Sequence, residues 1–370
     1  MATDLSTTVV AGGFVLGLVF GGVAQKSNFC TMGAISDVVN MGHWGRMRMW
    51  MLAVAVAMLG AAGLAAGGWV DLSQAVVMRP NLPWLSLIVG GLVFGAGMTL
   101  TGGCPSRNLV RLGGGSLRSF VVLVFVAVAG YMTLKGLFGA WRAAWLDPVA
   151  LPLAEWGWPD QGLPTALSRA TGLATTTALG VAVAAIAVPL AAFALRDARF
   201  RGNVWQWVGA LIIGGVIVGG WYVSGHLGFG ENPETLEDSF FATNSRTLES
   251  LSFIAPLAFG LELLLLWTDQ SLHLSFGIAA VGGMILGAAG VALATRRFRW
   301  EGFASLSDLR QQLLGAAMMG FGGVTALGCT VGQGLSGLST LAMGSFLATA
   351  AIVVGCVATL KWLAWREEAR

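Results

Sequence analysis

The chain has 370 residues, of which 56% are hydrophobic, 11% are charged and 54 are glycine. Soluble globular domains contain about 25% charged residues, so this composition excludes an ordinary cytosolic enzyme. The formal net charge of +3 is too small to indicate nucleic-acid binding. Glycines within runs of Leu, Val and Ala allow helices to approach closely in a bilayer. We therefore predict an all-α, polytopic membrane protein.

Ten apolar runs are candidate membrane segments, since a helix needs about 20 residues to span the hydrocarbon core. In chain order they are 8–24, 50–67, 85–101, 119–138, 171–195, 205–223, 251–267, 275–294, 312–326 and 340–362. No basic region precedes the first run, so we expect it to stay in the membrane and not to be cleaved as a signal peptide. Several runs are short, which indicates tilted, broken or re-entrant helices.

The distribution of charge reduces these ten runs to nine predicted crossings. Basic residues cluster at 46–48, 107–118, 196–201, 296–299 and 361–370, whereas segment 224–250 is acidic, with Glu231, Glu234, Glu237, Asp238 and Glu249. Lys and Arg concentrate on the cytoplasmic side of a membrane. All five basic clusters obey this rule if the N-terminus is outside, the C-terminus is cytoplasmic and run 251–267 does not cross. That run is short and contains Pro256, Gly260 and Glu262.

A glycine precedes a cysteine by nine positions three times in the chain. The first two copies begin near the same pentapeptide, GLVFG, and the third begins with GFG. The copies end at Cys30, Cys104 and Cys329, and a weaker fourth copy ends at Ser224, where a hydroxyl replaces the thiol. In the nine-crossing topology, the helices before Cys30 and Cys104 run inward and the other two run outward. The two halves are therefore predicted to be inverted repeats.

This repeat defines the predicted domain organisation. Segments 1–138 and 205–370 are the N-terminal and C-terminal inverted repeats, and 139–204 supplies a periplasmic linker and one extra transmembrane helix. Together they form a single transmembrane transport domain. Inverted repeats with interrupted helices place binding sites near the middle of the bilayer, at the interface between the repeats. The architecture is thus typical of a transporter more than of an enzyme.

The residues around the three cysteines indicate broken helices. Pro105 directly follows Cys104, and proline cannot continue a helix interior without losing a hydrogen bond. The segments around Cys30 and Cys329 are polar or rich in glycine. Non-helical backbone at membrane depth is tolerated where it is buried in protein or lines a cavity. Helix N-termini exposed at such breaks present N–H groups and therefore favour an anion.

Three motifs resemble those of the YeeE/YedE family of sulphur-compound permeases: KSNFC at 26–30, GGCPSR at 102–107 and GCTVGQGLSG at 328–337. The similarity extends from Gly13 to the last helix. The resemblance implies a two-fold-related helical bundle with an hourglass-shaped path, thiosulfate uptake, and substrate-handling roles for Cys30, Cys104 and Cys329. It also implies a separate cytoplasmic sulfurtransferase of the TusA type as a partner. Cys356 belongs to no motif and is expected to serve packing.

Neutral thiols suit thiosulfate, a dianion whose terminal sulfur accepts hydrogen bonds weakly. A thiol is a weak donor and a polarizable acceptor, and in apolar surroundings it stays protonated. Conduction needs several weak sites, because the ion must leave as well as enter. The remaining candidates for the path are Lys26, Arg107 and Arg111, which attract the anion at the mouths or merely snorkel to the interface, and Asn28, Ser224 and Gln333, which contact its oxyanion end. We expect no catalytic residues, metal or cofactor.

Two other functions stay open at this point. A membrane thiol enzyme could relay reducing equivalents or sulfane sulfur, but it would favour a CxxC motif or a base beside a thiol. A non-specific anion channel would use its cysteines for packing only. The segment GQGLSG fits the dinucleotide pattern GxGxxG, yet no strand precedes it. We therefore favour a permease of the cell inner membrane for thiosulfate or a related sulphur oxyanion.

Overall fold

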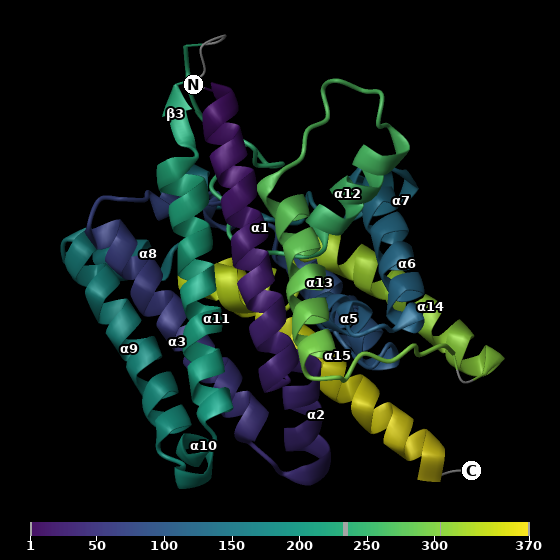
Figure 1. Ribbon diagram of the computed structural model, residues 1–370. Coiled ribbons are helices and arrows are strands. Elements are labelled where there is room, and N and C mark those ends of the chain that lie inside the picture. The colour runs from purple at the N-terminus through teal and green to yellow at the C-terminus, as the bar shows by residue number, and fades with distance from the viewer. Residues whose placement is uncertain (1, 232–235, 304, 369–370) are drawn as a thin grey trace.

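The computed structural model describes residues 2–231, 236–303 and 305–368, which fold mainly into helices (Figure 1). Glu234 and Arg370, which belong to two of the charge clusters, lie outside the described residues. The first helices are α1 (Ala2–Ser27), α2 (Thr31–Met41), α3 (Gly45–Ala66), α4 (Trp84–Leu100), α5 (Pro105–Gly113), α6 (Leu117–Leu134) and α7 (Leu137–Trp145). The others are α8 (Leu163–Thr171), α9 (Thr175–Leu195), α10 (Ala198–Gly202), α11 (Val204–Tyr222), α12 (Ala255–Leu265), α13 (Phe276–Ala294), α14 (Leu306–Thr325) and α15 (Met343–Glu368).

Short helical turns and strands lie in the loops between these helices. Three are 3₁₀ helices, η1 (Leu72–Gln74), η2 (Val76–Met78) and η3 (Leu153–Trp156), and two are π-helices, η4 (Val223–Leu227) and η5 (Gly332–Gly337). Two antiparallel pairs of strands join β1 (Asn81–Leu82) to β2 (Leu151–Pro152) and β3 (Phe229–Glu231) to β4 (Asp238–Phe240). Leu82 lies opposite Leu151, so the segment predicted as a linker is tied to the loop that follows α3.

Eight helical stretches in the described residues are long and apolar enough to cross a membrane, and the predicted all-α polytopic class is confirmed. α12 has 11 residues and therefore spans about 16 Å, roughly half of the hydrocarbon core, as expected for a run that does not cross. α14 has 20 residues but carries Asp308, Arg310 and two glutamines in its first two turns. The count of nine crossings stays a prediction, with α14 as the ninth helix.

The two GLVFG segments pack two pairs of helices almost backbone to backbone. A Cβ atom added at Gly21 of α1 would lie 2.0 Å from the carbonyl oxygen of Met284 in α13, closer than real atoms come. A Cβ added at Gly95 of α4 would lie 2.2 Å from the carbonyl oxygen of Ile352 in α15. Small residues permit such contacts, which supply the dispersion energy that holds membrane helices together. The packing role expected for both glycine motifs is confirmed.

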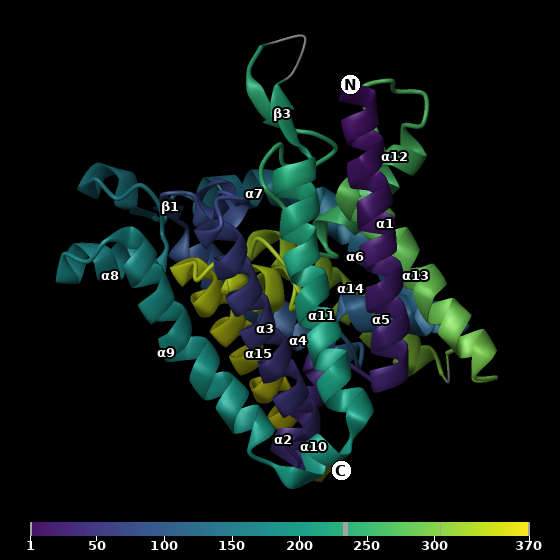
Figure 2. The ribbon, with the colours of Figure 1, turned by 60° about the vertical axis from the view of Figure 1, so that its left-hand side comes forward.

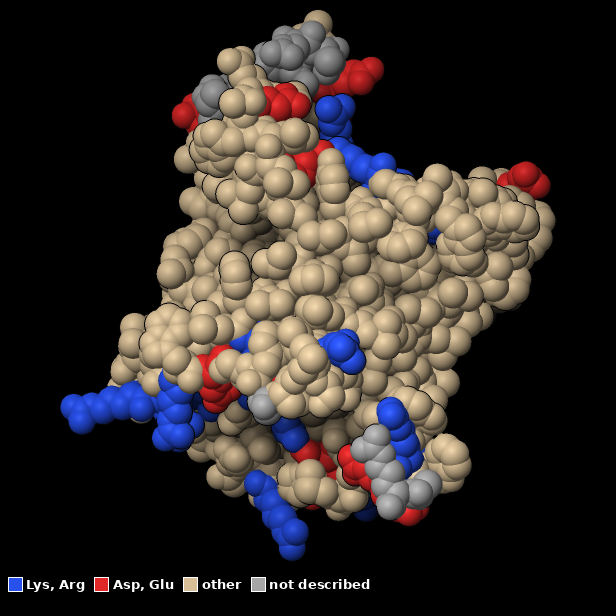
Figure 3. Space-filling model, turned by 90° about the vertical axis from the view of Figure 1, so that its right-hand side faces the viewer, with Lys and Arg blue, Asp and Glu red and all other residues tan. Residues whose placement is uncertain are grey.

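The two ends of the bundle differ in charge. Figure 2 shows β3, α7 and α12 at the same end as the N-terminus, with α10 and the C-terminus at the opposite end. In Figure 3 most of the Lys and Arg side chains on the visible face gather at that opposite end, below a belt with few charges. We call this end the basic face; it carries the arginines of α10, the segment after α13 and the end of α15. The other end, which carries the N-terminus and the loop after η4, is the N-terminal face.

Candidate functional site

Cys30 occupies the break between α1 and α2. α1 ends at Ser27, and Asn28 adopts a left-handed conformation with φ of 56°, which turns the chain out of the helix. Cys30 is extended and caps α2, because its sulfur accepts the N–H of Gly33 at 3.3 Å. The thiol is therefore held at the N-terminus of a helix, within the bundle, and its residue is only 6% exposed.

Cys104 lies in a second break, between α4 and α5. The chain leaves α4 through Gly102, whose φ is 66°, and α5 begins at Pro105. Proline fits this first helical position since it needs no N–H there. The Cys104 sulfur lies 3.1 Å from Oγ of Ser106, and the residue is fully buried. The helix interruption expected from Pro105 is therefore present.

Cys329 lies in a third break, after α14. Leu327 has a φ of 57°, and the Cys329 sulfur accepts the N–H of Gly332 at 3.4 Å. The acceptor and donor are three residues apart, as they are for Cys30 and Gly33. The chain then enters the π-helix η5 and not a regular α-helix. Two of the three motif cysteines thus hold their sulfurs in the same local way, on opposite halves of the sequence.

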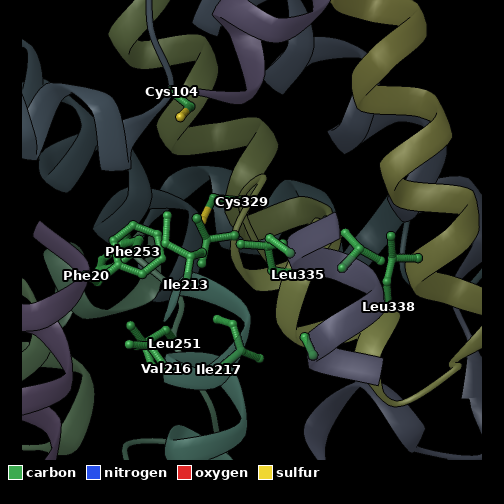
Figure 4. Packing of buried hydrophobic residues seen from close by; sticks show 14 of the residues in the cluster. Phe20, Cys104, Ile213, Val216, Ile217, Leu251, Phe253, Cys329, Leu335 and Leu338 are labelled. Carbon is green, nitrogen blue, oxygen red and sulfur yellow. The ribbon is translucent and has the colours of Figure 1, made fainter. Parts of the chain in front are cut away.

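The three breaks meet inside the bundle. The thiols of Cys30 and Cys104 lie close enough to act on each other. Thr330, the neighbour of Cys329, approaches the Cys104 sulfur, and its hydroxyl oxygen is buried without a hydrogen-bond partner in the described residues. Cys104 and Cys329 belong to the buried apolar cluster that contains Phe253, and in Figure 4 Cys329 lies near the labelled apolar side chains while Cys104 stands apart from them. All three thiols are free and buried.

A cavity of about 200 Å³ approaches Cys329 from the N-terminal face. Its wall includes Gly332, whose N–H binds the Cys329 sulfur, and Glu249, the one ionisable residue that lines it among the described residues. One carboxylate oxygen of Glu249 accepts the N–H of Ser245 at 2.9 Å. Burial raises the pKa of this carboxyl group above its ordinary value. The cavity thus lies beside the third break, with Gly328 and Gly332 on either side of Cys329 in its wall.

Two of the predicted path residues lie together beside the first break. Arg107, on α5, donates from Nη2 to Oδ1 of Asn28 at 3.3 Å. Arg111 follows one turn later on the same helix, and both arginines lie close enough to Cys30 to interact with it electrostatically. Lys26 is separate from this group, because its ammonium lies over the ring of Trp205, 4.8 Å from the centroid.

The other two predicted residues make mainly structural contacts. The side chain of Gln333, which is 1% exposed, donates to the carbonyl oxygen of Ala326 at 2.7 Å, and its Oε1 has no hydrogen-bond partner among the described residues. The hydroxyl of Ser224 donates to the main-chain oxygen of Glu249. The chain does not break at Ser224, since α11 continues directly into η4. The weak fourth copy of the repeat thus lacks the helix break of the other three, because no left-handed residue or proline interrupts it.

Sequence reasoning did not single out Thr330 or Glu249 for the site. Thr330 follows a motif cysteine directly, so its position was a signal available in the sequence. Glu249 belongs to an acidic loop whose composition is typical of a solvent-exposed segment. Its place in the cavity wall depends on how this loop folds back over the helix bundle. Cys356 makes a helix–helix contact, accepting the hydroxyl of Thr99 at 3.2 Å.

Membrane-spanning helices that break at buried, convergent thiols define a membrane transport protein. The chain belongs to the sulphur transport family, whose profile matches residues 26–358, and the resemblance drawn from the cysteine motifs is confirmed. It is 27% identical to a thiosulfate transporter, TsuA, of Spirochaeta thermophila, over 96% of this chain and 99% of that protein. It is 22% identical to the thiosulfate transporter TsuA of Escherichia coli K12, over 97% of this chain and 95% of that protein.

Proposed function

We propose that the protein is a permease that imports thiosulfate, or a closely related sulphur oxyanion, along a path lined by the thiols of Cys30, Cys104 and Cys329. The observation that carries this proposal is the meeting of helix breaks at buried free thiols, two of which lie close together. The named function of both relatives supports the choice of substrate.

Weak contacts explain why thiols would serve conduction. Each S–H can turn toward the terminal sulfur of thiosulfate without charge repulsion, and its weak contact lets the dianion leave as well as enter. The sulfurs of Cys30 and Cys329 already accept backbone N–H groups. Their own hydrogens are therefore free to donate to the passing anion.

The charge asymmetry supports an orientation in the inner membrane. The basic face would be cytoplasmic and the N-terminal face periplasmic, because Lys and Arg concentrate on the cytoplasmic side. Thiosulfate would then enter through the cavity beside Glu249 and leave past Arg107. In this orientation the two inverted repeats meet at the cysteines, and a cytoplasmic sulfurtransferase of the TusA type would receive the anion at the basic face. The protein itself would perform no chemical step.

Uptake of labelled thiosulfate into proteoliposomes tests the proposal. Replacement of Cys30, Cys104 or Cys329 by alanine should reduce initial uptake at least tenfold, while Cys356→Ala should retain most of it. Cys356 is the matched control, because it is also buried and free but lies in no helix break, and its sulfur accepts the hydroxyl of Thr99 on a neighbouring helix. Full uptake by all three motif variants would contradict a thiol-lined path.

A sulfane-sulfur relay is the second candidate, favoured by the proximity of the Cys30 and Cys104 thiols. Thiosulfate labelled separately on its two sulfur atoms distinguishes the two functions. A permease delivers both labels to the lumen in equal amounts, whereas a relay delivers only the terminal sulfur and leaves sulfite outside. We expect equal delivery under reducing, anaerobic conditions.

A further inference from the structure

Two arginines on α5 stand without counter-ions beside the paired thiols. Arg107 and Arg111 are four residues apart, so their side chains project from the same face of the helix. The Nη1 atom of each guanidinium is buried and has no hydrogen-bond partner in the described part of the chain. No carboxylate of that part lies within ion-pair distance of either one.

The surroundings of these arginines are electropositive. Two neighbouring cations, Arg107 and Arg118, act electrostatically on Arg111, and Arg118 is itself paired with Asp308 at 3.6 Å. The break after α4 closes the site on one side, since a Cβ atom at Gly103 would lie 3.5 Å from Nη1 of Arg111. Buried guanidinium donors without acceptors are costly, and a bound anion would satisfy them.

We propose that Arg107 and Arg111 form a binding site for a divalent tetrahedral oxyanion at the inner end of the path. This inference rests on the proposed function and extends it by a second type of site. The planar guanidinium groups would each donate in a forked geometry to the sulfonate oxygens of thiosulfate. Its terminal sulfur would then face Cys30 and Cys104, so the anion would be oriented with its oxygens toward the basic face.

The proposed site makes a prediction about sulfate. Sulfate presents the same tetrahedral oxygens and charge but has no terminal sulfur for the thiols. It should therefore bind at the arginines and compete with thiosulfate there, without being carried through the thiol-lined segment. Sulfate applied at the basic face should inhibit uptake more strongly than sulfate applied at the N-terminal face.

Thermal unfolding of the purified full-length protein tests the site without any transport. Millimolar sodium sulfate, compared with sodium chloride at equal ionic strength, should raise the Tm of the wild type in a saturable way. The variants Arg107→Gln and Arg111→Gln should weaken sulfate binding by about tenfold or more, because each removes charge-assisted hydrogen bonds. Arg310→Gln, which removes an exposed arginine of α14, should bind sulfate as the wild type does.

Arg111→Lys is a second variant in case the glutamine variants fail to fold, because lysine keeps the positive charge but cannot donate two parallel hydrogen bonds. It should fold and bind sulfate more weakly than the wild type does. A wild type with no saturable shift, or a shift that both glutamine variants retain, would overturn the site. Thiosulfate uptake by a wild type that shows no sulfate binding would overturn the site and leave the proposed function standing. Sulfate binding by a protein that takes up no thiosulfate would support the site and refute the proposed function.

Discussion

At the scale of single residues, Cys30 combines an observed structural role with the transport role that we propose. Cys30 caps a helix with its sulfur, a role for which a hydroxyl is better suited than a thiol. The use of cysteine at a capping position therefore indicates that the thiol is needed for something other than folding. Equal spacing alone led to this interpretation from the sequence, and it could not show that Cys30 lies close to Cys104.

The variant Cys30→Ser separates these two properties. A serine hydroxyl would accept the N–H of Gly33 and preserve the cap, so the Tm should stay within a few degrees of the wild type. Uptake of thiosulfate should nevertheless fall at least tenfold, because the polarizable S–H contact is lost. Parallel measurement of Tm and uptake checks this, and a serine variant that transports normally would assign Cys30 to capping only.

Glu249 predicts a dependence of uptake on external pH. Burial raises the pKa of its carboxyl group, and the ionised form would repel an incoming dianion in the cavity. Uptake should therefore increase as external pH falls and the carboxyl becomes protonated. The pKa of this carboxyl group is higher in the folded than in the unfolded protein. The free energy of unfolding should therefore also decrease as pH rises above the unfolded-state pKa. Glu249→Gln should give fast uptake with a flat pH profile; a variant with the wild-type profile would show that another group titrates.

At the scale of elements, the glycines of α13 provide a matched pair of tests. A Cβ atom at Gly287 would lie 2.0 Å from the carbonyl oxygen of Leu18 in α1, whereas nothing lies within 4 Å of a Cβ at Gly290. Gly287→Ala should separate the two helices and lower the Tm clearly. Gly290→Ala should leave the Tm unchanged or raise it slightly, since alanine favours a helix by about 0.5–1 kcal/mol over glycine. Equal effects would refute backbone contact between α1 and α13.

The sequence predicted most elements but few of their partners. Apolar runs and glycine spacing located the long helices and the packing role of GLVFG, because both follow from local composition. They did not show that one copy packs on α13 and the other on α15, which depends on how distant segments fold together. Run 251–267 forms the short helix α12, and the sequence did not show that its Glu262 contacts Lys135, at 2.5 Å between Oε1 and Nζ, 127 positions away at the end of α6.

At the scale of the whole molecule, the sequence did not predict which loops fold back over the helix bundle. Leu248 pairs with Ala75, far away in the chain, and this contact carries Glu249 to the wall of the cavity. No periodicity marks such a loop, because its position is set by the tertiary packing of the helices beneath it. The inverted repeat, in contrast, was inferred from spacing and topology, and it stays a prediction that depends on the orientation of the chain.

Cysteine accessibility in intact cells tests that orientation. The four native cysteines are buried, so they should give little background labelling. Glu237→Cys places an exposed thiol in the acidic loop of the N-terminal face, and Gly302→Cys places one in the segment that follows the arginines after α13. A membrane-impermeant maleimide should label Glu237→Cys in intact spheroplasts and Gly302→Cys only after lysis, because basic segments stay in the cytoplasm.

The reverse pattern would invert the topology, and with it the direction from Glu249 to Arg107 along which we expect the anion to move. Labelling of both positions from outside would require an even number of crossings between them, so that α13 could not be the single helix that separates the two loops.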